Sequence, residues 1–85
     1  MEYVVVAFRS REHTVRFYGL LSQNGVASEI INTPKEAGVG CGLSVKIKKE
    51  NFSTVKNAVR YASLSSFAGF FLVTILSGKR TVRSI

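Results

Sequence analysis

The stretch Tyr3-Val4-Val5-Val6-Ala7-Phe8 decides the fold of this 85-residue chain. It is apolar at every position and rich in valine, which predicts a central strand covered on its inner face and shielded by neighbouring strands. Ser10 then suits the N-cap of a helix, and Glu12 falls in the first turn. Asn24-Gly25 is expected to end this helix, because Gly25 accepts the left-handed backbone conformation.

A second strand is expected at Val26–Ile31, and Pro34 ends it because proline cannot donate a ladder hydrogen bond. Lys35–Gly42 holds three glycines around Cys41 and predicts a loop. Leu43–Lys48 alternates apolar and polar residues, so we expect a strand with one buried face and one solvated face.

The later part of the chain predicts one more helix and one more strand. Asn51 can cap a helix whose apolar stripe runs to about residue 62. Phe67–Leu76 is a continuous apolar strand, and Ser77-Gly78 predicts a turn. The basic segment Lys79–Ile85 is either a tail or a short extra strand that pairs back.

This order of elements predicts an α+β fold, a ferredoxin-like βαββαβ sandwich. Its sheet is expected to have four antiparallel strands, with two helices on one face. Residues 1–76 would form a single domain, and residues 77–85 would form the basic tail or extra strand.

Charge and hydropathy narrow the class of protein. Twelve Lys and Arg stand against five Glu, and the formal net charge of +7 favours anionic partners such as nucleic acid, phosphorylated ligands or an acidic protein. The ten apolar residues of Phe67–Leu76 fall short of the roughly 20 that a membrane helix needs. The N-terminus lacks the basic start of a secretory signal, so we expect a cytoplasmic protein without a membrane partner.

The single cysteine excludes a disulfide framework and a zinc site built on several cysteines of one chain, and we expect no metal and no cofactor. A right-handed βαβ crossover makes the first two strands parallel. The loop that carries Cys41 and the start of the first helix then lie at the same end of the sheet. Four residues at this end are candidates for stabilising a thiolate: Arg9, Ser10, Arg11 and His13.

Two interpretations of Cys41 stay open on the residues alone. Free cysteines are often buried and inert. The flanking glycines, by contrast, would expose the sulfur and leave backbone N–H groups free to face it. A reactive and a structural cysteine are therefore weighed equally at this point.

Three motifs stand out in and before this loop: Val4-Val5-Val6-Ala7-Phe8-Arg9-Ser10, Thr33-Pro34-Lys35-Glu36 and Gly40-Cys41-Gly42-Leu43-Ser44. With these motifs the chain resembles the selenium/sulfur (Se/S) carrier protein-like family of short bacterial proteins. The resemblance covers about residues 3–62 and departs after Leu64, where the chain is longer and more apolar. It implies that Cys41 holds a persulfide or perselenide, in a binding loop that includes Thr33, Pro34, Lys35, Gly40 and Gly42.

The function expected from these features is a sulfur or selenium carrier or accessory protein, not an enzyme with its own turnover. Its partners would be a protein donor and a protein acceptor. The alternative is a small non-catalytic module that binds or dimerises, with Phe67–Leu76 as the homodimer segment. Such a module would associate with nucleic acid only weakly and electrostatically, because Leu43–Lys48 offers no aromatic side chain for stacking on bases.

Overall fold

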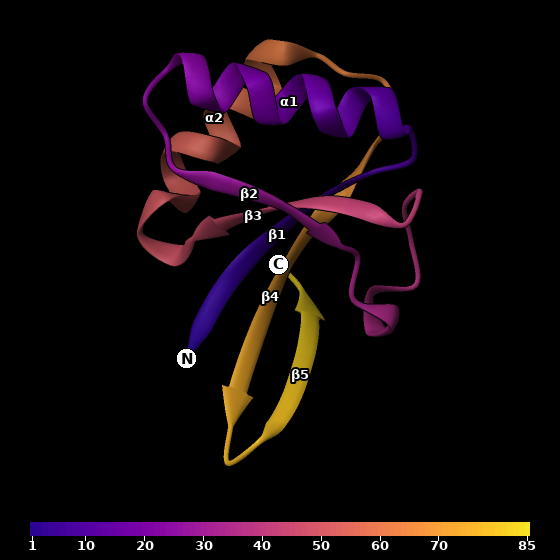
Figure 1. Ribbon diagram of the computed structural model, residues 1–85, viewed down its shortest axis with the longest axis vertical. Helices are drawn as coiled ribbons and strands as arrows, with labels where there is room; N and C mark the ends of the chain where they lie inside the picture. Colours follow the sequence, from indigo (N-terminus) through magenta and orange to yellow (C-terminus); the bar gives the residue numbers. More distant parts are fainter.

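The computed structural model describes all 85 residues, which form five strands and two α-helices (Figure 1). Two short 3₁₀ helices, η1 (Lys35–Ala37) and η2 (Lys49–Asn51), precede β3 and α2. The main elements follow in the order β1 (Glu2–Phe8), α1 (Arg11–Gln23), β2 (Ser28–Asn32), β3 (Leu43–Lys48), α2 (Phe52–Ala62), β4 (Phe67–Leu76) and β5 (Lys79–Ser84).

The sheet has the strand order β2-β3-β1-β4-β5, and every neighbouring pair is antiparallel. The α+β class is confirmed, but the prediction of a four-stranded sheet is wrong. The cause lies in the turn between β4 and β5, where Ser77 and Gly78 have φ values of 51° and 77°. Two positive φ angles in a two-residue turn give the twist that a tight hairpin needs, so Lys79–Ser84 folds back and pairs with β4.

Both helices pack on one face of the sheet, and the main core lies between them and the strands (Figure 1). β1 supplies Val4, Val6 and Phe8 to this core, all fully buried. The other buried members come from both helices and from β3 and β4: Phe17, Leu21, Val45, Ile47, Val55 and Leu72.

A second, smaller core lies on the opposite face of the sheet. Val5 and Ala7 of β1 pack there with Phe71 and Val73 of β4. This cluster is covered by Ala37 and Val39 of the loop after β2 and by Val82 of β5, which all pack against it. The loop therefore covers this face as the helices cover the other, while Val82 of β5 extends the apolar surface within the sheet. β1 is apolar throughout because both of its sides are buried.

Of the two predicted helix caps, one forms a capping hydrogen bond and the other does not. Ser10 caps α1 as predicted: its hydroxyl accepts a hydrogen bond from the backbone N–H of His13 at 3.1 Å. Asn51 occupies the N-cap position of α2, but its side chain makes no capping hydrogen bond. Its backbone has φ −91° and ψ 4°, because η2 leads directly into α2 without an extended residue between them.

The apolar segment Phe67–Leu76 lies inside the sheet. β4 pairs with β1 on one side and with β5 on the other, and its side chains alternate between the two cores. Leu76, at its end, is the exposed large residue of this strand. Neither helix of the fold is long and apolar enough to cross a membrane.

Replacing Phe71 by alanine tests the second core. Phe71 is 7% exposed, so we expect Phe71→Ala to lower the free energy of unfolding by about 3–5 kcal/mol. The matched control is Tyr61→Ala, since Tyr61 is 88% exposed and should cost less than about 0.5 kcal/mol. Denaturant unfolding measures both values, and equal small losses would contradict a packed core on this face.

Candidate functional site

Cys41 lies at the end of the sheet where β1 stops and α1 begins, as the topology predicts. Its backbone N–H donates a hydrogen bond to the carbonyl oxygen of Phe8, the last residue of β1, at 3.2 Å. Ser10, two residues after Phe8, caps α1. The loop that carries the cysteine is thus attached to the sheet beside the first turn of α1.

The glycines on both sides of Cys41 are required by the backbone. Gly40 and Gly42 have φ values of 98° and 95°, which side chains other than glycine rarely adopt. A Cβ atom on Gly40 would also stand 3.2 Å from the Phe8 carbonyl oxygen. Gly40 therefore allows the loop to approach β1 closely, and this approach places Cys41.

The sulfur of Cys41 is half-buried and has two polar neighbours. The Thr14 hydroxyl lies 3.7 Å from Sγ, and the Leu43 carbonyl oxygen lies 3.6 Å from it, within reach of a thiol proton. Thr14 is fully buried in the first turn of α1, and its hydroxyl can donate to the carbonyl oxygens of Ser10 (3.0 Å) or Leu43 (3.4 Å). The sulfur therefore sits against a buried hydroxyl whose proton has several possible acceptors.

The sequence analysis missed Thr14. A signal for it exists, because Thr14, Phe17 and Leu21 recur at helical spacing and form the buried face of α1. A threonine in an otherwise apolar stripe needs a polar partner, since an unpaired buried hydroxyl is costly. That partner comes from the cysteine loop and from the preceding turn of the helix.

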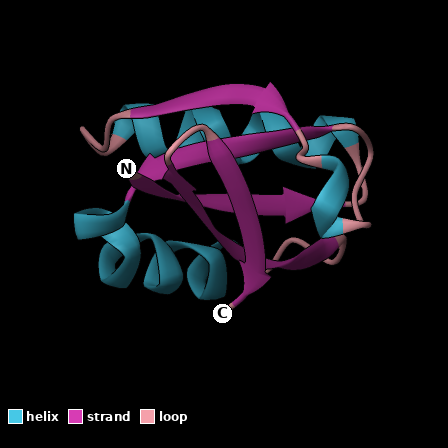
Figure 2. Ribbon diagram, turned by 90° about the horizontal axis from the view of Figure 1, so that it is seen from below, coloured by secondary structure: helices cyan, strands magenta, loops and turns pink.

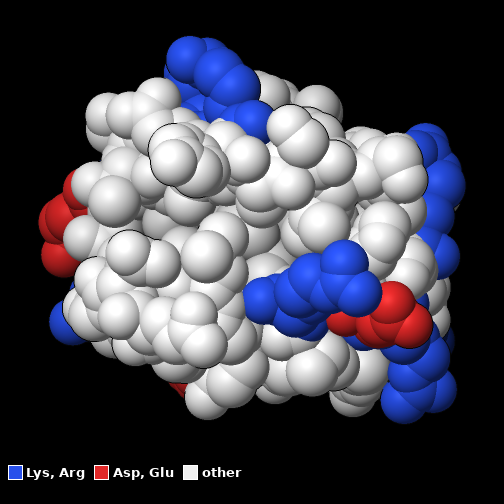
Figure 3. All heavy atoms as spheres, turned by 90° about the horizontal axis from the view of Figure 1, so that it is seen from above, with Lys and Arg blue, Asp and Glu red and all other residues white.

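The four candidates for stabilising the thiolate lie at the predicted end, but none of their side chains bonds to the sulfur. Ser10 caps the helix, and the His13 ring nitrogen Nδ1 lies 2.6 Å from the Ser66 hydroxyl. Arg9 and Arg11 are exposed and belong to no ion pair. Figure 3 shows Lys and Arg side chains gathered toward the end of the helical face where α1 begins. The action of the four candidate residues on Cys41 stays a prediction.

The residues of the Thr-Pro turn shape the loop without touching the sulfur. The Thr33 hydroxyl lies 2.6 Å from the Ser44 hydroxyl, and its backbone N–H donates to the Gly42 carbonyl oxygen at 2.9 Å. Pro34 is buried, whereas Lys35 is exposed and belongs to no ion pair. Thr33 therefore closes the base of the loop, and a role of Lys35 at the sulfur stays a prediction.

An ion pair that the sequence analysis missed ties this loop to the last strand. The Arg80 guanidinium of β5 donates two hydrogen bonds to the Glu36 carboxylate of η1, at 2.8 and 2.9 Å. These bonds hold the pKa of Glu36 below its usual value. No local pattern could reveal the pair, because its partners are 44 residues apart and meet only when β5 folds back.

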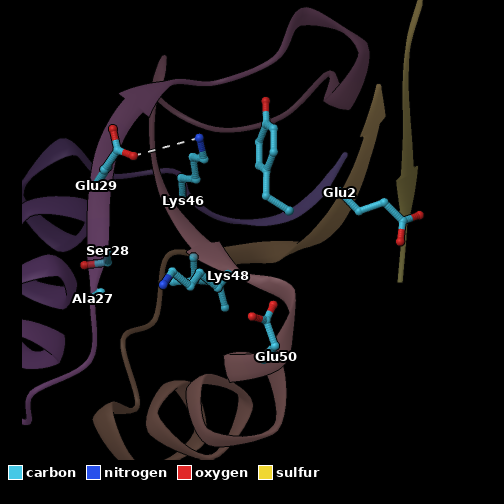
Figure 4. A pocket seen from close by; sticks show the side chains of 9 residues that line it. Glu2, Ala27, Ser28, Glu29, Lys46, Lys48 and Glu50 are labelled. Carbon is cyan, nitrogen blue, oxygen red and sulfur yellow. Dashed lines mark ion pairs between the residues drawn. The ribbon is translucent and has the colours of Figure 1, made fainter. Parts of the chain in front are cut away.

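A separate pocket of about 190 Å³ lies at the opposite end of β1 (Figure 4). One ion pair lies within its lining: the Lys46 ammonium is 3.8 Å from the Glu29 carboxylate, and it is also 4.5 Å from the centre of the Tyr3 ring. Glu2, at its rim, bonds to Lys49 at 2.7 Å. Nowhere in the chain do three His, Cys, Asp or Glu side chains form a group that could hold a metal ion.

The fold and the loop together define a class of α+β protein in which one cysteine, flanked by glycines, lies beside the first turn of α1. The chain belongs to the Putative Se/S carrier protein-like family, whose model matches residues 3–65. The resemblance seen in the sequence is thereby confirmed, and the matched segment includes the whole cysteine loop but ends before β4 and β5. Searches of the curated proteins and of the solved structures found no match to the chain.

The ion pair between Glu36 and Arg80 predicts a pH-dependent contribution to stability. The pKa of Glu36 is lowered on folding, so the pair stabilises the protein above the usual glutamate pKa of about 4.3 and is lost as pH falls through the lowered value. We expect Glu36→Gln to be less stable than the unmodified protein at about pH 6, with the difference closing at about pH 2.

Denaturant unfolding at a series of pH values measures this difference. Glu29→Gln is the matched control, since Glu29 lies on β2, 3.8 Å from Lys46, and takes no part in the ion pair between Glu36 and Arg80. A difference that does not change with pH would show that the carboxylate charge of Glu36 has no part in holding the loop.

Proposed function

We propose that this protein carries sulfur or selenium on Cys41, as a persulfide or perselenide, between a donor protein and an acceptor protein. Membership of the Se/S carrier-like family supports a carrier. The observation that supports Cys41 as the carrying residue is the position of its half-buried sulfur, which lies 3.7 Å from the Thr14 hydroxyl in the first turn of α1.

Loading is a transfer of one sulfur atom without net oxidation. The Cys41 thiolate attacks the terminal sulfur of a donor persulfide, a new S–S bond forms at Cys41, and the donor's S–S bond breaks. The electron pair of the broken bond leaves with the donor as its thiolate. Unloading is the same reaction with an acceptor thiolate as the attacking group, and selenium can replace the transferred sulfur.

Thr14 has the right chemistry to support the anionic forms. A protonated thiol can donate to the Leu43 carbonyl oxygen, which lies at 3.6 Å. A thiolate has no proton to donate and instead needs a donor, which the Thr14 hydroxyl can become by turning from the Ser10 carbonyl oxygen toward the sulfur. A hydrogen bond to a charged acceptor is stronger than one to a neutral acceptor, so this exchange favours the anion.

Positive charge near the start of α1 also favours the thiolate form of Cys41. The free N–H groups at the start of α1 carry partial positive charge, and Arg9 and Arg11 add two cations that no carboxylate neutralises. The chain has no second cysteine, so a loaded sulfur cannot be lost to an internal disulfide. The sulfur must leave to another molecule, which is what a carrier requires and an enzyme with its own turnover does not.

The alternative, a module that binds nucleic acid weakly or dimerises through Phe67–Leu76, stays a prediction. The face that an RNA-recognition module would use is occupied at its centre by Ala37 and Val39. The only aromatic side chain that β1 or β3 offers on this face is Tyr3, and Lys46 lies over its ring. These contacts favour the carrier over a base-reading surface.

Loading with a small-molecule persulfide tests the carrier. We expect the intact mass to rise by one sulfur atom, and we expect Cys41→Ser to abolish this gain because no other thiol is present. Treatment with a reducing agent should restore the original mass. A mass gain that persists in Cys41→Ser, or no gain in the unmodified protein, would overturn the proposal.

Thr14 gives a sharper test of the mechanism. Thr14→Val keeps the shape of the side chain but removes the hydroxyl, so we expect slower alkylation of Cys41 near neutral pH, by about tenfold or more if one charge-assisted hydrogen bond is lost. Thr14→Ser should retain most of the rate, and Thr54→Val on the exposed surface of α2 should leave it unchanged. Equal rates in all four proteins would exclude a hydrogen bond from Thr14 to the thiolate.

A further inference from the structure

A groove of about 460 Å³ opens between α2 and the part of the sheet next to β5. Its apolar floor is formed by Phe52 of α2, Phe67 and Phe70 of β4, and Ile85, which follows β5. We call this surface the α2 groove. Val59 and two cations, Lys56 and Arg60, all from α2, complete its lining.

The groove is open because the sheet is wider than its helical cover. The added strand β5 extends the sheet beyond β4, and the chain ends beside α2 (Figure 2). The backbone N–H of Ile85 donates to the Phe70 carbonyl oxygen at 3.0 Å, which fixes the outer wall. The Phe70 ring contacts the rings of Phe52 and Phe67, with centroids 5.1 and 4.9 Å apart, so the floor is a packed aromatic surface.

The charge of the α2 groove has one sign. Lys56 and Arg60 are exposed and belong to no ion pair, and no glutamate lines the groove. A second copy of this chain is a poor occupant, because each copy carries a net charge of +7. The ammonium of Lys56 lies 5.3 Å from the centre of the Phe52 ring, so it stands over the apolar floor. An apolar floor with two cations that no carboxylate pairs matches an acidic segment that also carries apolar side chains.

The groove begins close to the cysteine. Phe8 pairs with Phe67 of β4 on one side, and its carbonyl oxygen binds the Cys41 N–H on the other side. Two strand spacings of about 4.8 Å separate the backbones of Cys41 and Phe67, that is, about 10 Å. The Cys41 sulfur contacts Thr14 of α1, and the α2 groove lies on the same helical side of the sheet.

We propose that the α2 groove binds a short acidic segment with apolar side chains from the donor or the acceptor protein. The proposal rests on the carrier function, since the partner it names is the donor or the acceptor of the carried atom. A segment whose apolar side chains contact Phe67 and Phe70 would bring its protein to the end of the molecule where Cys41 lies. The acidic side chains of the segment would pair with Lys56 and Arg60.

The test uses a synthetic peptide of alternating leucine and glutamate as the probe, with polyglutamate of the same charge as the comparison. We expect the Leu-Glu peptide to shift the NMR amide signals of α2, Phe67, Phe70 and Ile85. The double substitution Lys56→Glu with Arg60→Glu should weaken its binding by about tenfold or more. Ile85→Glu changes the apolar wall at a residue that is 48% exposed, and it should weaken binding as well.

The control is Lys48→Glu with Lys79→Glu, which makes the same change in charge at exposed lysines outside the groove. Equal weakening in both double variants, or equal affinity for polyglutamate, would overturn the proposal in favour of general charge attraction. If raising the protein concentration without peptide shifts the NMR signals of the groove residues, and sedimentation shows a dimer, the α2 groove binds a second copy of the chain instead. Persulfide loading of Cys41 from a small molecule should be unchanged in Lys56→Glu with Arg60→Glu. Loss of peptide binding and loss of persulfide loading are therefore separate results, and each tests only its own proposal.

Discussion

The burial of β1 on both faces is the constraint on which the rest of this structure depends. All five residues from Val4 to Phe8 are fully buried, and apolar surface of this kind contributes about 25 cal/mol per Å² removed from water. Both helices of this chain cover the same side of the sheet. On the other side, Ala37 and Val39 of the loop after β2 pack over Val5, Ala7, Phe71 and Val73, and Val82 of β5 packs beside them in the sheet.

The same constraint builds the cysteine site. The loop must cross the open face of the sheet to cover it and then return to begin β3 at the end of β1. There Gly40 approaches the Phe8 carbonyl oxygen, and Cys41 donates a hydrogen bond to it. α1 starts just beyond Phe8, so its first turn brings Thr14 to the sulfur. A cysteine on a loop, which alone would be unremarkable chemically, is thereby placed against a helix start and a buried hydroxyl.

The residues after the family match add side chains that contact the cysteine loop and that line the α2 groove. Residues 3–65 contain β1 through α2 and the whole cysteine loop. β4, β5 and Ile85 lie beyond them. They contribute Arg80, which binds Glu36 of the loop, and Phe67, Phe70 and Ile85, which are three of the seven residues that line the α2 groove. The family segment thus contains Cys41, and the C-terminal hairpin both supports the loop and forms part of the α2 groove.

The sequence by itself determined β1 to β4 and both α-helices, the Ser10 cap, the family and the meeting of Cys41 with the start of α1. These follow from periodicity, from capping residues and from the handedness of the βαβ crossover, all of which are local or topological rules. Only the tertiary structure decided that β5 makes a fifth strand, that Thr14 contacts the sulfur, and that Arg80 binds Glu36. Such pairs join segments far apart in the chain, and their contacts depend on how the segments pack rather than on any pattern within each one.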